Sequence, residues 1–318
     1  MGSRRIVNVD EERFPNAAPE FGCPICGHST PVPVLAKNGY TIACCAACSV
    51  LHVSPIPSNE MLQAHYQDPS YFSGPEEQGY QSYSAMRKAL IPHFKRRLAV
   101  VRSQVPTGGR LLDFGCAAGY FLDVARSEGW QIAGVELSQE MARRASDMLS
   151  IPIASSLDSL PDGDFDAICL WEVIEHLPRP IAELRLLRDR LRPGGLLMLS
   201  TPNTGHWQAK RQPDGWIGYR PPSHLVFFDE RTLADALARA GFDRVTITRV
   251  SPLPPLPNWL RDLTAPLQRG LSTGQARAWP VALMAWRATR LLGWGWQMLR
   301  HPGDDIFATL EAVAFRSA

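Results

Sequence analysis

The sequence predicts an α/β fold with a mainly parallel sheet. Short apolar segments of strand length alternate with helical segments between residues 110 and 250, a pattern typical of βαβ units. A turn of small residues stands directly after the first of these segments. The 318 residues are 45% hydrophobic and 20% charged, which allows a real core and excludes global disorder.

Each element of the alternation has its own signal. The first strand starts at Arg110 and stops at Gly115, and apolar residues at helical spacing follow over 121–130. Further strands are expected where apolar residues run together, at 131–135, 165–171, 195–201, 244–250 and 306–315. Helices are expected at 85–101, 180–191 and 230–240, the last of them ended by Gly241.

Shifts in composition divide the chain into six parts. They are a flexible tail (1–20), a cysteine-rich module (21–58), a helical and aromatic cap (59–104), the core (105–250), a helical insert (251–305) and the last core strand (306–318). Lys and Arg number 33 against 31 Asp and Glu, and a net charge of +2 argues against a protein whose main task is to hold nucleic acid. The N-terminus lacks the apolar run of a secretory signal, so we expect a cytoplasmic protein.

Cysteines are concentrated in the module. Cys23 and Cys26 form one C-x2-C pair, Cys45 and Cys48 form another, and 18 residues separate the pairs. This spacing is typical of a zinc ribbon with four thiolate ligands, so we expect a structural zinc ion. Four thiolates leave no open coordination position, which argues against catalytic zinc. Cys44 is an alternative to Cys45 as a ligand, and free thiols or redox cysteines are alternatives to the metal.

The turn after the first strand predicts a ligand site. Gly115, Ala117 and Gly119 are small residues that let the backbone approach a ligand, and a helix N-terminus follows. The turn is not G-x-G-x-x-G, so the nicotinamide-binding pattern is not met. Glu136, at the end of the second strand, is placed to accept hydrogen bonds from ribose hydroxyls. Together these features predict a nucleoside-type ligand, and a purely structural turn is the alternative.

Residues 111–121 resemble motif I of class I S-adenosylmethionine-dependent methyltransferases, usually written D-x-G-x-G-x-G, with Ala117 in place of the middle glycine. Residues 165–177, 191–203 and 224–242 are similar to later motifs of the same family, so the resemblance spans about 105–250. It implies a Rossmann-like, doubly wound, mainly parallel sheet of seven strands. It also implies S-adenosylmethionine as the cofactor.

The resemblance places the cofactor at the carboxyl ends of the first two strands. Asp113 would act through the amino group of the cofactor, with a helix N-cap as its alternative role, and Asp158 would contact the adenine. The cofactor-binding residues expected in all are Asp113, Gly115, Ala117, Gly119, Glu136, Leu137, Asp158 and Trp171.

His176, His224 and Tyr219 are the expected catalytic residues. The histidines are candidate bases, and the phenols of Tyr66, Tyr71 and Tyr219 are candidates to orient the acceptor. Histidine titrates in the right range for a base, and His176 follows the fourth strand, near the expected position of the methyl group. The module resembles the zinc segment of deoxysugar C-methyltransferases, in which a Glu-His pair opens the block matching Ser223 and His224 and the histidine is implicated in acid–base work. Here serine replaces that glutamate. A helix cap for His176 and a buried hydrogen-bonding role for His224 are alternatives.

The expected function is methyl transfer to a small-molecule acceptor: a glycosyl, secondary-metabolite or lipid-linked compound. In-line displacement depends mostly on positioning and on exclusion of water. One alternative is an RNA methyltransferase that uses the ribbon as a clamp, although Lys37 is the one lysine or arginine of residues 21–57. Another is a non-catalytic protein that binds the cofactor.

The insert is tryptophan-rich and carries an amphipathic helix. Over 281–300, arginines gather on one side of the helix and apolar residues on the other. Two arginines inside the run argue against a transmembrane span. The helix is expected to act as a lid, as a homodimer face or as a peripheral membrane contact through 279–300.

Overall fold

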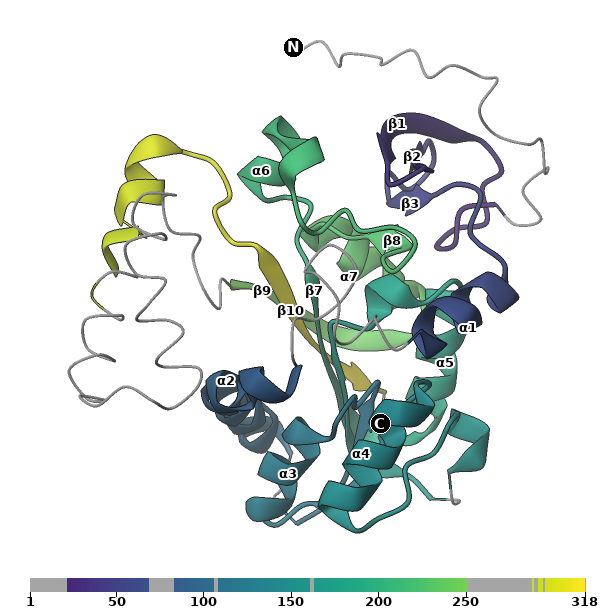
Figure 1. Cartoon of the computed structure of the whole chain (residues 1–318), viewed down its shortest axis with the longest axis vertical. Helices are drawn as coiled ribbons and strands as arrows, with labels where there is room; N and C mark the ends of the chain where they lie inside the picture. Colours follow the sequence, from purple (N-terminus) through teal and green to yellow (C-terminus); the bar gives the residue numbers. More distant parts are fainter. Residues whose placement is uncertain are drawn as a thin grey trace.

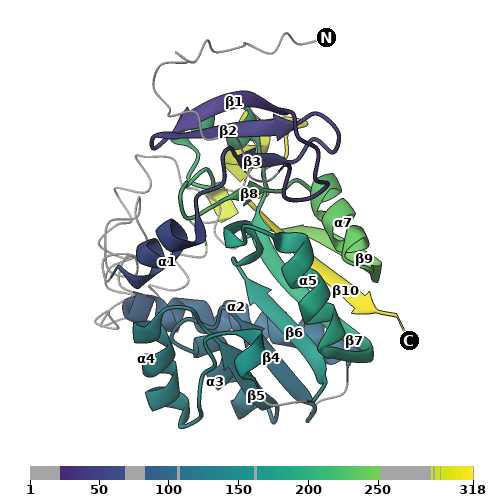
Figure 2. The ribbon, with the colours of Figure 1, turned by 90° about the vertical axis from the view of Figure 1, so that its right-hand side faces the viewer.

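Two β-sheets organise the described part of the chain. The computed structural model describes residues 22–68, 83–105, 108–160, 163–250, 288, 291–293 and 295–317. A sheet of six strands forms the core, and a sheet of four strands lies at one end of it (Figures 1 and 2). The core sheet has the order β5-β4-β6-β7-β10-β9 and the small sheet the order β1-β2-β3-β8.

The core strands confirm the predicted alternation. They are β4 (Arg110–Phe114), β5 (Gln131–Val135), β6 (Phe165–Trp171), β7 (Leu191–Pro202), β9 (Phe242–Val250) and β10 (Thr309–Arg316). β5, β4, β6 and β7 are parallel neighbours in that order, and β10 is antiparallel to both β7 and β9. The α/β class and the mainly parallel sheet are therefore confirmed.

The predicted seventh strand is not formed among the described residues. Beyond β5, where a further edge strand would pair, a single bridge joins Val135 to Ala154. Pro152, next to the bridging segment, has no backbone N–H to donate, which is unfavourable for a longer ladder. The described sheet thus has six strands, and at its β5 edge a single bridge takes the place of a seventh strand.

Helices cover both faces of the core sheet because apolar residues alternate along its central strands. In β6, Ala167 and Cys169 pack with one set of helices, whereas Ile168 and Leu170 pack with the other. The first set is α2 (Tyr83–Gln104), α3 (Tyr120–Ser127) and α4 (Gln139–Leu149). The second set is α5 (Pro180–Asp189) and α7 (Glu230–Arg239).

The small sheet joins the cysteine-rich module to the core. Its strands are β1 (Pro31–Lys37), β2 (Tyr40–Cys45), β3 (Leu51–Val53) and β8 (Val226–Phe227). β8 belongs to the core segment in sequence, so a division at residue 58 separates the module along the chain but not in space. Two further helices are α1 (Asn59–Gln67) and α6 (Trp207–Arg211), and three short 3-10 turns lie at Leu157–Ser159, Ile174–His176 and Pro213–Gly215.

Most of the predicted insert lies outside the described residues, as do the tail and Tyr71. Residues 291–293 and 295–300 are helical, and the side chains of Leu291 and Leu299 are 74% and 81% exposed. Within the ranges given above, no helix is long and apolar enough to cross a membrane.

Candidate functional site

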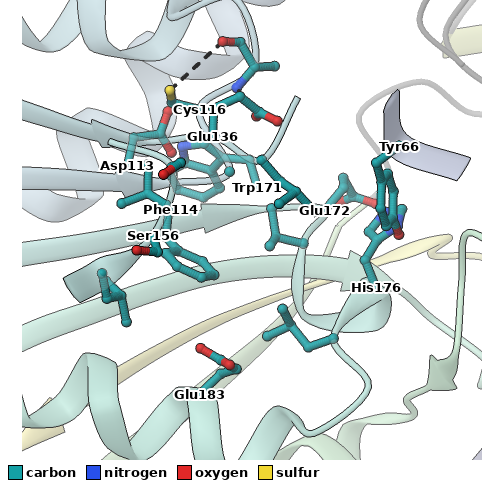
Figure 3. Close-up of a pocket in the computed structure, with 18 of the residues that line it drawn as sticks. Tyr66, Asp113, Phe114, Cys116, Glu136, Ser156, Trp171, Glu172, His176 and Glu183 are labelled. Atoms are coloured by element: carbon teal, nitrogen blue, oxygen red, sulfur yellow. Dashed lines mark hydrogen bonds between the residues drawn. The ribbon is translucent and has the colours of Figure 1, made fainter. Parts of the chain in front are cut away.

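A cavity of about 580 Å³ opens at the carboxyl ends of β4, β5 and β6. Asp113, Glu136 and Trp171 line it from the core sheet, and Tyr66 and Leu62 line it from α1. Figure 3 shows Asp113 and Glu136 close together and, away from them, Tyr66 beside His176. The cavity therefore has two ends, which we call the sheet end and the α1 end.

The turn after β4 forms the floor of the sheet end. Gly115 has a φ of 81°, and a Cβ there would approach Val173 Cγ2 to 2.6 Å, so the position requires glycine. Gly119 also has a positive φ, of 77°, and begins α3. A Cβ at Gly119 would meet Leu149 at 2.8 Å, so this residue permits helix packing and does not line the cavity.

Glu136 holds the turn in place. One carboxylate oxygen accepts the backbone N–H of Ala117 at 2.8 Å, and the other accepts that of Ser138 at 2.8 Å. Burial raises the pKa of this carboxyl, while the backbone donors act in the opposite direction. Each oxygen keeps a second lone pair, so Glu136 can still accept hydrogen bonds from a ligand in the cavity.

Ala117, the departure from the methyltransferase motif, has a φ of 46°. A left-handed conformation is unfavourable for alanine, so we expect Ala117→Gly to stabilise the protein by about 0.5–1 kcal/mol. Thermal unfolding should show a melting temperature higher by about 1–3 °C. Ala118→Gly is the matched control, because Ala118 is not among the residues with positive φ and its replacement should lower stability. Equal losses in both variants would contradict a strained Ala117.

Asp113 presents an unsatisfied carboxylate oxygen at the sheet end. The side chain is 1% exposed, and Oδ1 has no hydrogen-bond partner among the described residues. Burial raises the pKa of Asp113 well above its usual range, with a further contribution from Glu136, and Arg97 acts in the opposite direction. A buried acceptor without a donor is costly, so this position fits a ligand that brings an N–H or O–H group.

Three other predicted cofactor residues line the same cavity. Leu137 follows β5, Asp158 lies in the 3-10 turn Leu157–Ser159, and Trp171 ends β6. The ring of Trp171 packs edge-on against Phe121 with centroids 5.0 Å apart. The Arg97 guanidinium also lies over this ring, 4.4 Å from its centroid.

Arg97 was not anticipated from the sequence. It lies on α2, is 8% exposed, and its Nε donates to Glu311 on β10 at 2.9 Å. Arg96 makes a second, bidentate pair with the same carboxylate, and the two arginines lower the pKa of Glu311 against the effect of burial. Arginine and glutamate 214 positions apart carry no local pattern, so only the fold could bring them together.

At the α1 end, the Tyr66 hydroxyl has one side-chain partner and one backbone partner. Its hydroxyl is 2.9 Å from His176 Nδ1 and donates to the Ser223 carbonyl at 3.1 Å. The ring of His224 meets that of His176 edge-on, with centroids 4.8 Å apart. His176 lines the cavity, and His224 lies directly behind it.

Both imidazoles are neutral. Burial lowers the pKa of His176 well below its usual value, and burial with nearby Arg220 lowers that of His224 to about 3. His224 Nδ1 is 2.8 Å from the Gly218 carbonyl, which can only accept, so Nδ1 carries the proton. The Tyr66 hydroxyl proton goes to Ser223, and this assignment leaves His176 Nδ1 as the donor to Tyr66. Nε2 of each ring is then the basic nitrogen.

Tyr219 lies away from the cavity, contrary to the positioning role expected from the sequence. It is 5% exposed and packs edge-on against Trp216 and Phe227, with centroids 4.6 and 5.1 Å away. Burial raises its pKa. The structure thus packs Tyr219 against Trp216 and Phe227, and among the described tyrosines it is Tyr66 that lines the cavity.

Two glutamates near the α1 end were also missed: Glu175, which is buried behind it, and Glu172, which is half-buried and lines the cavity. Glu175 is 1% exposed; one oxygen accepts from the Thr201 hydroxyl at 2.9 Å, and Oε1 has no partner among the described residues. Glu172 accepts from the Ser200 hydroxyl at 2.7 Å. Burial raises the pKa of both carboxyls, and for Glu175 the neighbouring Glu172 adds to the shift. The sequence does contain a signal for them, because Glu172 and Glu175 stand three positions apart directly after the buried strand β6.

The four predicted zinc ligands come together in the module. Cys23 Sγ is 3.5 Å from Cys48 Sγ, Cys26 Sγ is 3.5 Å from Cys45 Sγ, and all four sulfur atoms lie within 4.8 Å of one another. Four thiolates around zinc at its usual bond length are about 3.8 Å apart, so the set fits a tetrahedral ion. Cys44 is not part of this group of four.

Backbone N–H groups point at the Cys45 sulfur. Burial acts to raise the pKa of this thiol, but hydrogen bonds from Cys48 and Ala47 outweigh it and lower the pKa to about 7. Such donors stabilise a thiolate, which is the form that binds a metal.

Comparison with known proteins adds a family match. A family model described as a methyltransferase domain matches residues 83–247. The ubiquinone biosynthesis O-methyltransferase of Xanthomonas campestris pv. campestris is 35% identical over 117 residues, which cover 34% of this chain and 49% of that protein. The chain therefore spans about half the length of the curated relatives it matches.

Solved structures show the same fold. Phosphoethanolamine N-methyltransferase 2 of Haemonchus contortus, in complex with phosphomonomethylethanolamine and S-adenosylhomocysteine, has a TM-score of 0.53 and 18% identity. Its complex with S-adenosyl-L-methionine has a TM-score of 0.52 and 17% identity. Each match covers 80% of this chain and 60% of that one.

Proposed function

The chain belongs to the methyltransferase domain family, and on that premise we propose that it transfers a methyl group from S-adenosylmethionine to a small-molecule acceptor. The observation that carries the proposal is the sheet end of the cavity. There the unpartnered oxygen of Asp113 and the carboxylate of Glu136 flank a turn whose backbone conformation brings the main chain to the cavity surface.

The residues of the sheet end fit the cofactor. Asp113 would accept a hydrogen bond from its ammonium group, and Glu136 would accept from its ribose hydroxyls. Leu137 and Asp158 would contact the adenine. When bound, S-adenosylmethionine supplies the methyl group and a positive charge, which suits a cavity lined by carboxylates.

The α1 end would hold the acceptor. His176 lines the cavity with a neutral imidazole, so its basic nitrogen can take the proton that a hydroxyl, amine or acidic carbon loses. Tyr66 fixes the orientation of that ring through its hydroxyl, and His224 packs against the far side. We therefore propose His176 as the base, Tyr66 as its positioning residue and His224 as a buried support.

Charge at the cavity favours an acceptor without phosphate groups near the reacting atom. Five carboxylates are among the described residues that line it, namely Asp113, Glu136, Asp158, Glu172 and Glu183, and no lysine or arginine is. An anionic group would find no cationic side chain there to pair with, whereas a neutral or basic group needs none. This argument also weighs against the RNA alternative, as does Lys37, whose ammonium group donates to the Asp214 carbonyl.

We propose a structural zinc ion for the module, held by Cys23, Cys26, Cys45 and Cys48. The mutual distances of the four sulfur atoms support it. The ion would supply cross-links in a segment with few residues of its own for a core.

Calorimetric titration of the zinc-loaded full chain with S-adenosylhomocysteine tests the proposal. We expect a saturable isotherm with one site, and no heat of binding with NAD⁺. Transfer of labelled methyl groups to glycosides or lipid-linked compounds, but not to RNA, would then identify the acceptor class. Absence of binding to the folded wild type would remove the cofactor site, and binding without transfer to any acceptor would favour a non-catalytic protein.

A further inference from the structure

The module contacts the segment that carries His224 at several points along its length. β3 pairs with β8 through Leu51 opposite Phe227, and the Val53 N–H donates to the Leu225 carbonyl at 2.8 Å. At the tip of the β1–β2 hairpin, Asn38 Nδ2 donates to the Pro221 carbonyl at 3.1 Å. Figure 2 shows β1, β2, β3 and β8 stacked in this order above the core sheet. The segment 221–227 is thus attached to the module on both sides of His224.

The Arg231 side chain adds a contact at the metal-ligand cluster itself. Its Nη2 donates to the Cys48 carbonyl at 3.1 Å, which ties the start of α7 to the second cysteine pair. Cys23, Cys45 and Cys48 belong with Leu225 and Phe227 to a large buried apolar cluster that also extends into the core sheet. The four-cysteine cluster therefore supports the 221–231 region directly.

The module also leads into α1, which carries Tyr66. Ser58 caps α1 with its side chain, five residues after β3 ends. From α1, Tyr66 donates to the Ser223 carbonyl and His65 Nε2 lies 2.8 Å from the Ser223 hydroxyl. The two segments fastened to the module thus meet at Ser223, beside His176.

The sheet end depends on other contacts. The turn after β4 is held by hydrogen bonds from the Gly115 and Cys116 N–H groups to the Val135 carbonyl, and by Glu136. Trp171 is held by Arg97 and Phe121, from α2 and α3. None of these groups belongs to the module; α1 reaches this end through Gln67, whose Nε2 donates to the Leu137 carbonyl at 3.0 Å.

We propose that the four-cysteine module positions the acceptor end of the cavity, through Asn38, β3 and α1, while the cofactor end is held mainly by the core, through Glu136, the Val135 carbonyl and Arg97. This inference rests on the proposed function, because it assigns the two ends of the cavity to acceptor and cofactor. It makes Asn38, which is remote from the cavity lining, a positioning residue for Ser223 and His224. If the contacts between the module and segment 221–227 are lost, we therefore expect poorer positioning of the acceptor and unchanged binding of the cofactor.

Asn38→Gly tests the proposal with little disturbance. Asn38 has a φ of 49°, which glycine adopts readily, so the substitution removes the hydrogen bond to Pro221 and keeps the backbone turn. Ser49→Gly is the matched control, because Ser49 is another exposed module residue with positive φ, of 65°, and within the described structure its side chain makes no hydrogen bond to 221–227. Both variants are to be studied as zinc-loaded full chains.

The readout is acylation of histidines by diethyl pyrocarbonate, followed by mass spectrometry. His224 is 6% exposed, so it reacts only when the 221–227 segment opens. Loss of one hydrogen bond favours the open form by about fivefold, so His224 should react about five times faster in Asn38→Gly. In Ser49→Gly its rate should equal that of the wild type. His206, which is 1% exposed and caps α6, serves as the internal control.

Titration with S-adenosylhomocysteine completes the experiment. An affinity for this probe within about twofold of the wild type in Asn38→Gly, together with faster acylation of His224, supports the proposal. Unchanged acylation of His224, or a parallel loss of affinity for the probe, overturns it. Failure of the wild type itself to bind the probe would instead overturn the proposed function, so the two failures are distinguishable.

Discussion

Glu136→Ala is expected to weaken the binding of S-adenosylhomocysteine by roughly 100-fold or more. A carboxylate that accepts two ribose hydroxyls contributes about 1.5–3 kcal/mol for each hydrogen bond, and about 1.4 kcal/mol is a tenfold change in affinity. The substitution also frees the N–H of Ala117, so the turn after β4 loses the bond that fixes it. Both effects act in the same direction. Calorimetry of the purified variant gives the dissociation constant.

The matched control for this variant is Glu140→Ala. Glu140 lies four residues later on α4, and its exposed carboxylate pairs with Arg144 on the surface, so its loss should leave the affinity unchanged. Glu136→Gln separates the two effects, because the amide keeps one acceptor oxygen of nearly the same shape. A wild-type affinity in Glu136→Ala with intact secondary structure would place the ribose elsewhere.

Removal of zinc is expected to lower the thermal stability of the protein strongly. Cys26→Ser, or treatment with a strong chelator, should release one zinc ion per chain and lower the melting temperature by about 10 °C or more. A structural zinc site of four cysteines contributes on the order of 10 kcal/mol to folding of its own segment. Here that segment shares a sheet and a buried cluster with the core, so part of the loss reaches the whole protein. Metal analysis and calorimetry give the two quantities.

Cys44→Ser distinguishes the ligand set. Cys44 is adjacent to Cys45, but it lies outside the group of four, and its sulfur is 3.7 Å from the Ser49 carbonyl. The variant should retain one zinc ion and the wild-type melting temperature. Loss of zinc from Cys44→Ser with retention in Cys45→Ser would contradict the assigned set and favour Cys44 as a ligand.

Local signals were enough for the core and for the sheet end of the cavity. The apolar runs gave β4 to β7 their positions, because a buried parallel strand needs apolar residues on both faces. Small residues at Gly115 and Ala117 and the acid at Glu136 were named from their spacing alone. The structure brings them to one cavity, and their cofactor roles stay predictions until they are tested.

Features that depend on pairing across the chain could not be predicted. β8 is two residues long and completes a sheet whose other strands lie about 170 positions earlier, so no periodicity indicates it. Tyr66 reaches His176 over 110 positions, and the sequence offered Tyr219 as an equal candidate. Burial decides between them, and burial is a property of the fold rather than of a local pattern.

The position of β10 has a consequence for the order in which the protein assembles. β10 stands between β7 and β9, and it is the latest in the chain of the described strands. Among the described strands, β9 pairs with β10 alone, so it can join the sheet only after residues 251–308 have been synthesised and β10 has formed. Until then β7 presents an open edge, which is the state most exposed to wrong pairing. β10 also brings Glu311 to Arg97, so the wall of the cavity at Trp171 is completed only when β10 has joined the sheet.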